Sequence, residues 1–154
     1  YTFKVKIAGN PDVETETLKK EITNLNLSGF VEILSKTTFP EIKDEFLNAD
    51  ALVAPSVKSA TGDRDGIPNV IVEAGLAGIP VISTKVSAIP EVIEEGKNGF
   101  LVEERNEEEL ALKMEKLIEN KNLRVEMGRR NREVILNKFG KENTIDKLVE
   151  LFES

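Results

Sequence analysis

The chain has 154 residues, 28 acidic against 21 basic, and its formal net charge of −7 argues against nucleic acid or an anionic membrane surface as the main partner. It has no histidine, which excludes a Ser-His-Asp triad and an imidazole base, and no cysteine, which excludes disulfides and fits a reducing, cytoplasmic compartment. The length suits one domain, residues 1–154, and no run of 18 apolar residues could cross a bilayer.

Strands and helices alternate along the chain. From residue periodicity and turn residues, the predicted strands are residues 2–8, 31–34, 51–54, 81–83 and 100–102. Helices are predicted over residues 13–25, 68–78, 106–119, 123–139 and 142–152. A further helix is predicted to begin at Pro40, and a single helical turn is predicted after Ser87. This order predicts an α/β fold, a doubly wound, Rossmann-like parallel sheet with a helical C-terminus.

A long polar loop, residues 55–67, follows the third predicted strand. Open α/β sheets bind ligands outside the carboxyl ends of their strands, so this loop is a candidate site on general grounds. Asp65-Gly66 forms a predicted turn, and Pro68 stands where a first helical residue would. The amino end of that helix faces whatever Gly66 and Ile67 border, and its free N–H groups favour a phosphate or another oxygen-rich group.

Glu73 is the single carboxylate in the apolar segment 70–77. Burying an unpaired carboxylate is unfavourable, so the segment needs a reason to keep a charge there. A bound ligand that offers hydrogen-bond donors would supply one. The alternative is a residue on the helix surface whose neighbours happen to be apolar.

The spacing Asp65-x7-Glu73, with GIPNVIVEAGLAGIPVIST around it and SAIPEVIEEGKNGFLV after it, resembles the C-terminal, nucleotide-sugar-binding domain of retaining family 4 glycosyltransferases of the GT-B fold. The likeness runs from the strand before Gly9 to the helices after Asn106. It implies that Glu73 accepts hydrogen bonds from the ribose hydroxyls of a nucleotide diphosphate sugar and that Asp65 lies by the transferred sugar. The family usually has the longer Glu where Asp65 stands.

The resemblance also assigns the surroundings of the donor. Backbone groups of Gly66, Ile67 and Pro68 would line the sugar and phosphate, although Pro68 has no N–H to give. Lys36 and Thr37 would border the nucleotide base, and an ordinary surface turn is the alternative for Lys36. The resemblance implies front-face sugar transfer in polysaccharide biosynthesis, with the leaving diphosphate as base and without a metal or other cofactor.

The sequence departs from the family in two further respects. Ser87 and Ala88 stand where two glycines are common, and their side chains would narrow the approach of backbone to donor. Compared with the family, we also expect the chain to lack the first strand–helix unit, with an Arg and a Lys for the diphosphate, and the N-terminal acceptor domain. We therefore expect weak nucleotide binding and no sugar transfer from this chain alone, whereas the full-length enzyme would be cytoplasmic, either free or peripheral to a membrane.

The missing strand would be central in the sheet. Closing the gap would pair residues 2–8 directly with 51–54 and give the flavodoxin-like order 2-1-3-4-5. The alternative is a homodimer through the open sheet edges.

Several patterns allow other interpretations. Asp63-Arg64-Asp65 matches a D-x-D pattern that binds a divalent ion in a different glycosyltransferase fold, and the lone Gly9 falls short of a GxGxxG fingerprint. The acidic run in residues 103–109 favours the start of a helix, and the arginines within 124–132 would meet either phosphate or nearby carboxylates.

Two other functions stay open on the sequence. A sugar epimerase-like or hydrolytic relative would need an additional catalytic acid, to which no residue can be assigned. A non-catalytic α/β nucleotide-binding or scaffold module resembling a receiver domain would need an Asp ending its third strand, where Ala54-Pro55-Ser56 stands.

Overall fold

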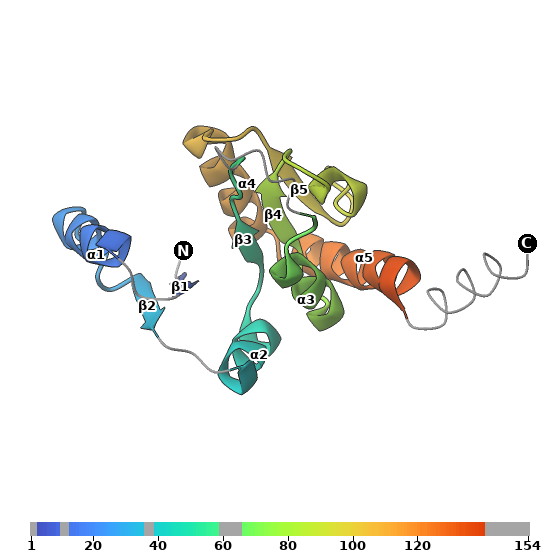
Figure 1. Cartoon of the computed structure of the whole chain (residues 1–154), viewed down its shortest axis with the longest axis horizontal. Coiled ribbons are helices and arrows are strands. Elements are labelled where there is room, and N and C mark those ends of the chain that lie inside the picture. The colour runs from blue at the N-terminus through green and yellow to red at the C-terminus, as the bar shows by residue number, and fades with distance from the viewer. Residues whose placement is uncertain (1–2, 10–12, 36–38, 59–65, 141–154) are drawn as a thin grey trace, which may run out of the picture. The chain divides into compact units, whose positions relative to one another are not determined.

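The elements of the fold follow the predicted order (Figure 1). The computed structural model describes residues 3–9, 13–35, 39–58 and 66–140. Its strands are β1 (Val5–Gly9), β2 (Val31–Ser35), β3 (Leu52–Ala54), β4 (Val81–Thr84) and β5 (Gly99–Val102). Its helices are α1 (Val13–Asn24), α2 (Phe39–Asn48), α3 (Asn69–Ala77), the short 3-10 helix η1 (Ile89–Glu91), α4 (Glu107–Glu119) and α5 (Lys121–Phe139). The helix predicted over 142–152 lies outside the described residues.

Residues 1–45 form one compact unit. In it β1 and β2 run parallel, in a register that extends from Val5 opposite Val31 to Gly9 opposite Ser35, and α1 makes the crossover between them. This pairing confirms the strand-1-to-strand-2 part of the predicted order.

Residues 46–154 form the second unit, which is built on a parallel sheet of order β3-β4-β5. Val81 of the central strand lies opposite Leu52 on one side and Gly99 on the other. Successive side chains of a strand point to opposite faces, so an apolar strand such as β4 supplies both faces of its sheet with core residues. All four residues of β4 and of β5 are buried.

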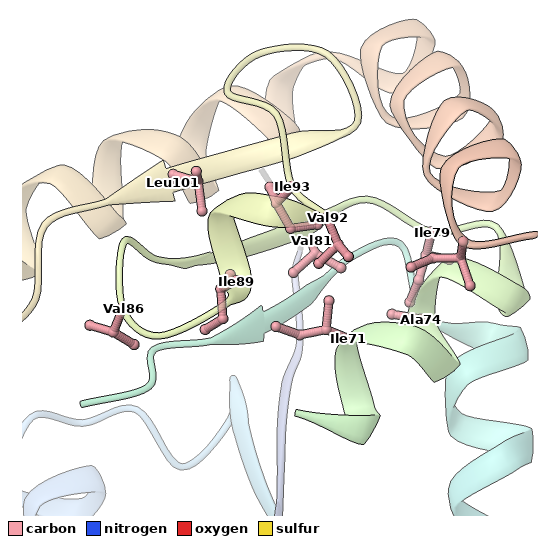
Figure 2. Packing of buried hydrophobic residues seen from close by; sticks show 10 residues of the cluster. Ile71, Ala74, Ile79, Val81, Val86, Ile89, Val92, Ile93 and Leu101 are labelled. Carbon is pink, nitrogen blue, oxygen red and sulfur yellow. The ribbon is translucent and has the colours of Figure 1, made fainter. Parts of the chain in front are cut away.

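One apolar cluster packs α3 against this sheet (Figure 2). Ile71 and Ala74 point inward from α3, and Val81 and Leu101 meet them from the sheet. The whole cluster consists of Ile71, Ala74, Ile79, Val81, Val86, Ile89, Val92, Ile93, Leu101 and Ile135. Because α3 buries this face, its opposite face is the one left for solvent or a ligand.

A second apolar cluster covers the other face of the sheet. Ile82, the strand neighbour of Val81, packs there with Phe100 and Val102 against Leu117 of α4 and Met127 of α5. α5 thus contributes to both clusters, since its Ile135 belongs to the first one. The sheet of this unit therefore lies between α3 and α4 and forms the α/β layering that the sequence predicts.

Glycines allow α5 to approach α3 closely. A Cβ atom on Gly75 of α3 would lie 2.2 Å from Cγ1 of Ile135, and one on Gly128 of α5 would lie 2.0 Å from the backbone oxygen of Gly78. The buried Asn131 of α5 donates from Nδ2 to the backbone oxygen of Ile79 over 2.9 Å. These contacts hold α5 against α3 and the turn that follows it.

The predicted pairing of residues 2–8 with 51–54 is not confirmed. In the described chain β1 pairs with β2 in one sheet, and β3, β4 and β5 form another, so Val5 and Leu52 belong to different sheets. The local pairs follow from short crossovers between consecutive strands, which sequence patterns capture well. Which open edges meet depends on tertiary contacts, and alternation of residues along a strand carries no information about them.

Candidate functional site

The described part of the predicted site, from Gly66 to Glu73, belongs to the second unit and contains the start of α3. β3 ends at Ala54, and α3 leads back to the start of β4, so the amino end of α3 lies at the carboxyl edge of the sheet. Pro68 is the N-cap residue rather than the first helical residue, with φ −56° and ψ 133°. Among the described residues no side chain caps this helix end, and the N–H of Ile71 donates to the backbone oxygen of Pro68, so the N–H groups of Asn69 and Val70 are the ones that could meet an external acceptor.

The other end of α3 is fully closed. Gly78 adopts a left-handed conformation, with φ +76°, and its N–H donates to the backbone oxygen of Gly75 while Ile79 donates to that of Ala74. This is the Schellman arrangement, in which a glycine satisfies the last carbonyls of a helix. Arg132 of α5 adds a 2.6 Å hydrogen bond to the backbone oxygen of Leu76. Within the part of the chain that the structure describes, side chains therefore contact the carboxyl end of α3 and not its amino end.

Glu73 lies partly exposed on α3, on the face opposite the core. Val70 and Leu76, 40% and 45% exposed, flank it at helical spacing. Among the described residues no hydrogen bond or ion pair reaches the Glu73 carboxylate. The expectation of a charge within a buried segment is thus corrected in part, because the helix turns Glu73 towards the accessible side while Ile71 and Ala74 are buried.

The other predicted site residues divide into two groups. Gly66 is exposed, with open space where a Cβ atom would stand, and Ile67 packs against the first apolar cluster. The segment that leads directly into the amino end of α3 thus consists of Gly66, Ile67 and Pro68. Asp65, Lys36 and Thr37 lie outside the described residues, as does the Asp63-Arg64-Asp65 pattern.

Ser83 and Thr84, at the carboxyl end of β4, are residues that the sequence analysis did not single out. They are 0% and 2% exposed, and their hydroxyls donate to the backbone oxygens of Ala54 and Ser56. The signal that could have revealed them is a pair of hydroxyls at the end of an otherwise apolar, buried strand. Such hydroxyls need a partner inside the protein or in a ligand.

The segment after β4 has unusual backbone geometry. Ser87 has φ +50°, a left-handed conformation that glycine adopts more readily than serine, whereas Ala88 has φ −90°. The left-handed conformation at position 87 is thus sufficient to explain why a glycine is common there in the family that the sequence resembles. The neighbouring Lys85 pairs with Glu103 over 2.6 Å, and this hydrogen bond raises the pKa of Lys85.

The arginines of residues 124–132 are engaged with protein groups. Arg124 bonds Asp50 and the backbone oxygens of Leu117 and Ile118. Hydrogen bonds from Arg129 and then Arg130 lower the pKa of Glu126 to about 2. Together with the Arg132 contact to α3, these bonds match the carboxylate-balancing interpretation more closely than a phosphate site.

The acidic run behaves as a helix start. Asn106 caps α4 by accepting a 3.0 Å hydrogen bond from the N–H of Glu109, and Glu107, Glu108 and Glu109 occupy its first turn.

Within the described residues, no group of three or more His, Cys, Asp or Glu side chains could hold a metal ion. None of the helices described there has the length and hydropathy to cross a membrane.

Comparison with known proteins finds a matching family and similar sequences. The family described as Glycosyl transferases group 1 matches residues 1–134. The putative colanic acid biosynthesis glycosyltransferase WcaL of Salmonella typhimurium is 36% identical over 112 residues, which make up 73% of this chain and 27% of that protein.

Solved structures share the fold. A variant of S. aureus TarM in complex with fondaparinux, alpha-GlcNAc-glycerol and UDP has a TM-score of 0.78 at 27% identity, over 98% of this chain and 29% of that chain. Anabaena HepE in complex with UDP has a TM-score of 0.81 at 23% identity, over 98% of this chain and 41% of that chain. The chain thus spans less than half the length of each of these proteins.

Proposed function

Because the chain belongs to the group 1 family of glycosyl transferases, we propose that it binds the nucleotide diphosphate sugar donor of a retaining, family 4 sugar transfer. The observation that carries this proposal is the Glu73 carboxylate, which is partly exposed in the middle of α3 and has no partner among the described residues. An acceptor of this kind suits a ribose diol, whose two hydroxyls can both donate to one carboxylate.

The amino end of α3 suits the diphosphate. Its N–H groups and the positive end of the helix dipole favour negative charge, and Gly66 in front of it presents backbone without a side chain. In the proposal Gly66, Ile67 and Pro68 line the sugar and phosphate, and Asp65 lies by the transferred sugar. Lys36 and Thr37 border the base.

The proposed chemistry depends on stabilising the leaving group. As a sugar leaves its nucleotide, negative charge grows on the diphosphate, and fixed N–H donors at a helix end stabilise that charge more than they stabilise the bound donor. The departing diphosphate then accepts the proton of the incoming acceptor hydroxyl on the same face of the sugar. No step requires a protein imidazole, which this sequence lacks.

The nucleotide is tested with the full chain and UDP, because the TarM variant similar to this chain is in complex with UDP. GDP serves as a second probe and inorganic pyrophosphate as a control for simple anion binding. In an amide chemical-shift titration, we expect UDP or GDP to shift Gly66, Ile67, Asn69 and Val70 in a saturable way, with pyrophosphate at equal concentration having a much smaller effect. Binding of neither nucleotide would favour a scaffold module and refute the proposal.

A metal-independent site is part of the same proposal. The titration is therefore repeated with EDTA and with Mn²⁺. We expect the same dissociation constant in both. Affinity that disappears with EDTA and returns with Mn²⁺ would show that a divalent ion takes part, as the Asp63-Arg64-Asp65 pattern allows.

A further inference from the structure

Asn98 forms a buried polar junction in the turn before β5. Its side chain is 1% exposed, and its amide oxygen accepts a hydrogen bond from the backbone N–H of Glu94 over 2.7 Å. Its Nδ2 donates to the backbone oxygen of Val92 over 2.8 Å and to Oδ1 of Asn131 over 3.3 Å. Because the surroundings offer one donor and two acceptors, they match an amide in this orientation.

A glycine is required directly after this asparagine. A Cβ atom on Gly99, the first residue of β5, would lie 2.4 Å from the backbone oxygen of Val81 and 3.0 Å from Cγ2 of Ile93. Only a residue without a side chain allows the two strands to approach in this way. Packing of the folded chain therefore places Asn next to Gly, a pair that the sequence contains once, at residues 98–99.

In a flexible chain, an asparagine followed by glycine is prone to deamidation. The backbone nitrogen of Gly99 attacks the side-chain amide carbon of Asn98, and the new C–N bond closes a five-membered imide. The side-chain nitrogen leaves as ammonia, taking the proton that the Gly99 nitrogen gives up. Water then opens the imide at one of its two carbonyls, which leaves aspartate or isoaspartate at position 98. Glycine favours the attack because it has no side chain to obstruct it and has a freely adjustable backbone.

The fold opposes this reaction. The amide carbon of Asn98 can turn towards the Gly99 nitrogen only if the hydrogen bonds of the junction break, and both residues are buried from the water that the second step needs. The reaction rate in the folded chain is then the rate in the unfolded chain multiplied by the unfolded fraction. This fraction is about 10⁻³–10⁻⁶ for ordinary proteins, so folding should slow the reaction about a thousandfold or more.

The product of the reaction does not fit the junction. A carboxylate has no N–H to donate to the Val92 oxygen or to Asn131, and it would bring a negative charge against two oxygens in a buried place. Isoaspartate also lengthens the main chain by one methylene group, directly before the first residue of β5.

We propose that Asn98 is a modification site that only the unfolded chain exposes, and that its deamidation prevents the chain from returning to the native fold. Unfolding thereby becomes irreversible in proportion to the time that the chain spends unfolded. This inference does not depend on the proposed nucleotide site, since it concerns the turn before β5 and its contact with α5.

The first test measures the reaction in the unsubstituted full chain at several denaturant concentrations. Mass spectrometry of its peptides gives the deamidation rate at Asn98, and the unfolding curve gives the unfolded fraction under the same conditions. Asn120, which is exposed and followed by Lys121, is the internal control. We expect the Asn98 rate to rise in proportion to the unfolded fraction and to exceed the Asn120 rate once the chain is unfolded. An Asn98 rate that is equal with and without denaturant would overturn the proposal.

The second test concerns the product. Asn98→Asp should lower the melting temperature, whereas Asn120→Asp should leave it unchanged, because Asn120 only accepts from the N–H of Leu123 at the start of α5 and Asp caps a helix equally well. An unchanged melting temperature for Asn98→Asp would refute the proposed consequence.

Refolding of the partly deamidated, unsubstituted chain decides the matter if Asn98→Asp does not fold. After dilution of the denaturant, the folded molecules are separated and digested. We expect them to retain Asn98, with the modified molecules confined to the unfolded fraction. An equal share of modified residue in both fractions would contradict the proposal.

Discussion

Replacing Glu73 with Gln tests the centre of the proposed site. The substitution keeps the length and shape of the side chain but removes the charge and one of the two oxygens that a ribose diol would use. A hydrogen bond to a charged group contributes roughly 1.5–3 kcal/mol, which corresponds to roughly a 10- to 150-fold loss of UDP affinity. The structure predicts little effect on folding, because Glu73 is partly exposed and has no partner among the described residues.

Two measurements separate a binding role from a structural one. Calorimetry or the amide titration gives the UDP dissociation constant, and denaturant unfolding gives the free energy of unfolding. We expect a stability change within about 0.5 kcal/mol, as for other surface substitutions without a partner. Glu115→Gln is the matched control, because Glu115 is an exposed carboxylate on α4, and it should alter neither quantity.

Two outcomes would contradict this role of Glu73. If Glu73→Gln leaves the UDP dissociation constant unchanged while the unsubstituted chain binds UDP, then the carboxylate does not hold the ribose. A loss of stability of several kcal/mol would likewise show that Glu73 has a structural partner, and the placement of the nucleotide over α3 would have to be abandoned.

Three further predictions concern the scaffold. Gly128→Ala should lower the free energy of unfolding, measured in a denaturant titration, by about 1–3 kcal/mol, because the new Cβ atom would lie 2.0 Å from a backbone oxygen of the turn after α3. An unchanged free energy of unfolding would mean that α5 is not packed this closely. Ser87→Gly should raise the melting temperature or leave it unchanged, since φ is +50° at this residue. Ala88→Gly should lower the melting temperature, since Ala88 has an ordinary φ of −90°. A lower melting temperature for Ser87→Gly than for Ala88→Gly would contradict the backbone geometry. The ion pairs that lower the pKa of Glu126 to about 2 stabilise the fold above pH 4.5, and this contribution is lost as the pH falls from 4.5 through 2. The stability difference between the unsubstituted chain and Glu126→Gln should therefore shrink over that range, and a constant difference would show that the arginines do not act through this carboxylate.

Local sequence patterns determined most of the secondary structure. Gly78 and the apolar spacing before it predicted the end of α3, because a left-handed C-cap suits glycine and the helix needs an inward face. Asn106 before three glutamates likewise predicted the start of α4. These features depend on neighbours within one turn of the chain, so a single sequence contains the information for them.

The location of the candidate site followed from the resemblance of residues 62–80 and from the rule that ligands bind at the carboxyl ends of parallel strands. Even so, the sequence placed Glu73 within an apolar segment and could not tell its buried side from its accessible one. That was decided when Ile71 and Ala74 packed on the sheet and turned Glu73 to the other face of α3.

Contacts between distant segments were decided by tertiary structure alone. Alternation along a strand does not specify which strand edges meet, so the sequence patterns of residues 2–8 and 51–54 could not establish their pairing. The roles of Gly128 and Thr84 depend on backbone oxygens that lie 50 and 28 residues away in the sequence. A close approach of this kind exists only after the chain has folded, so the sequence neighbours of these two residues do not identify the backbone oxygens that they approach.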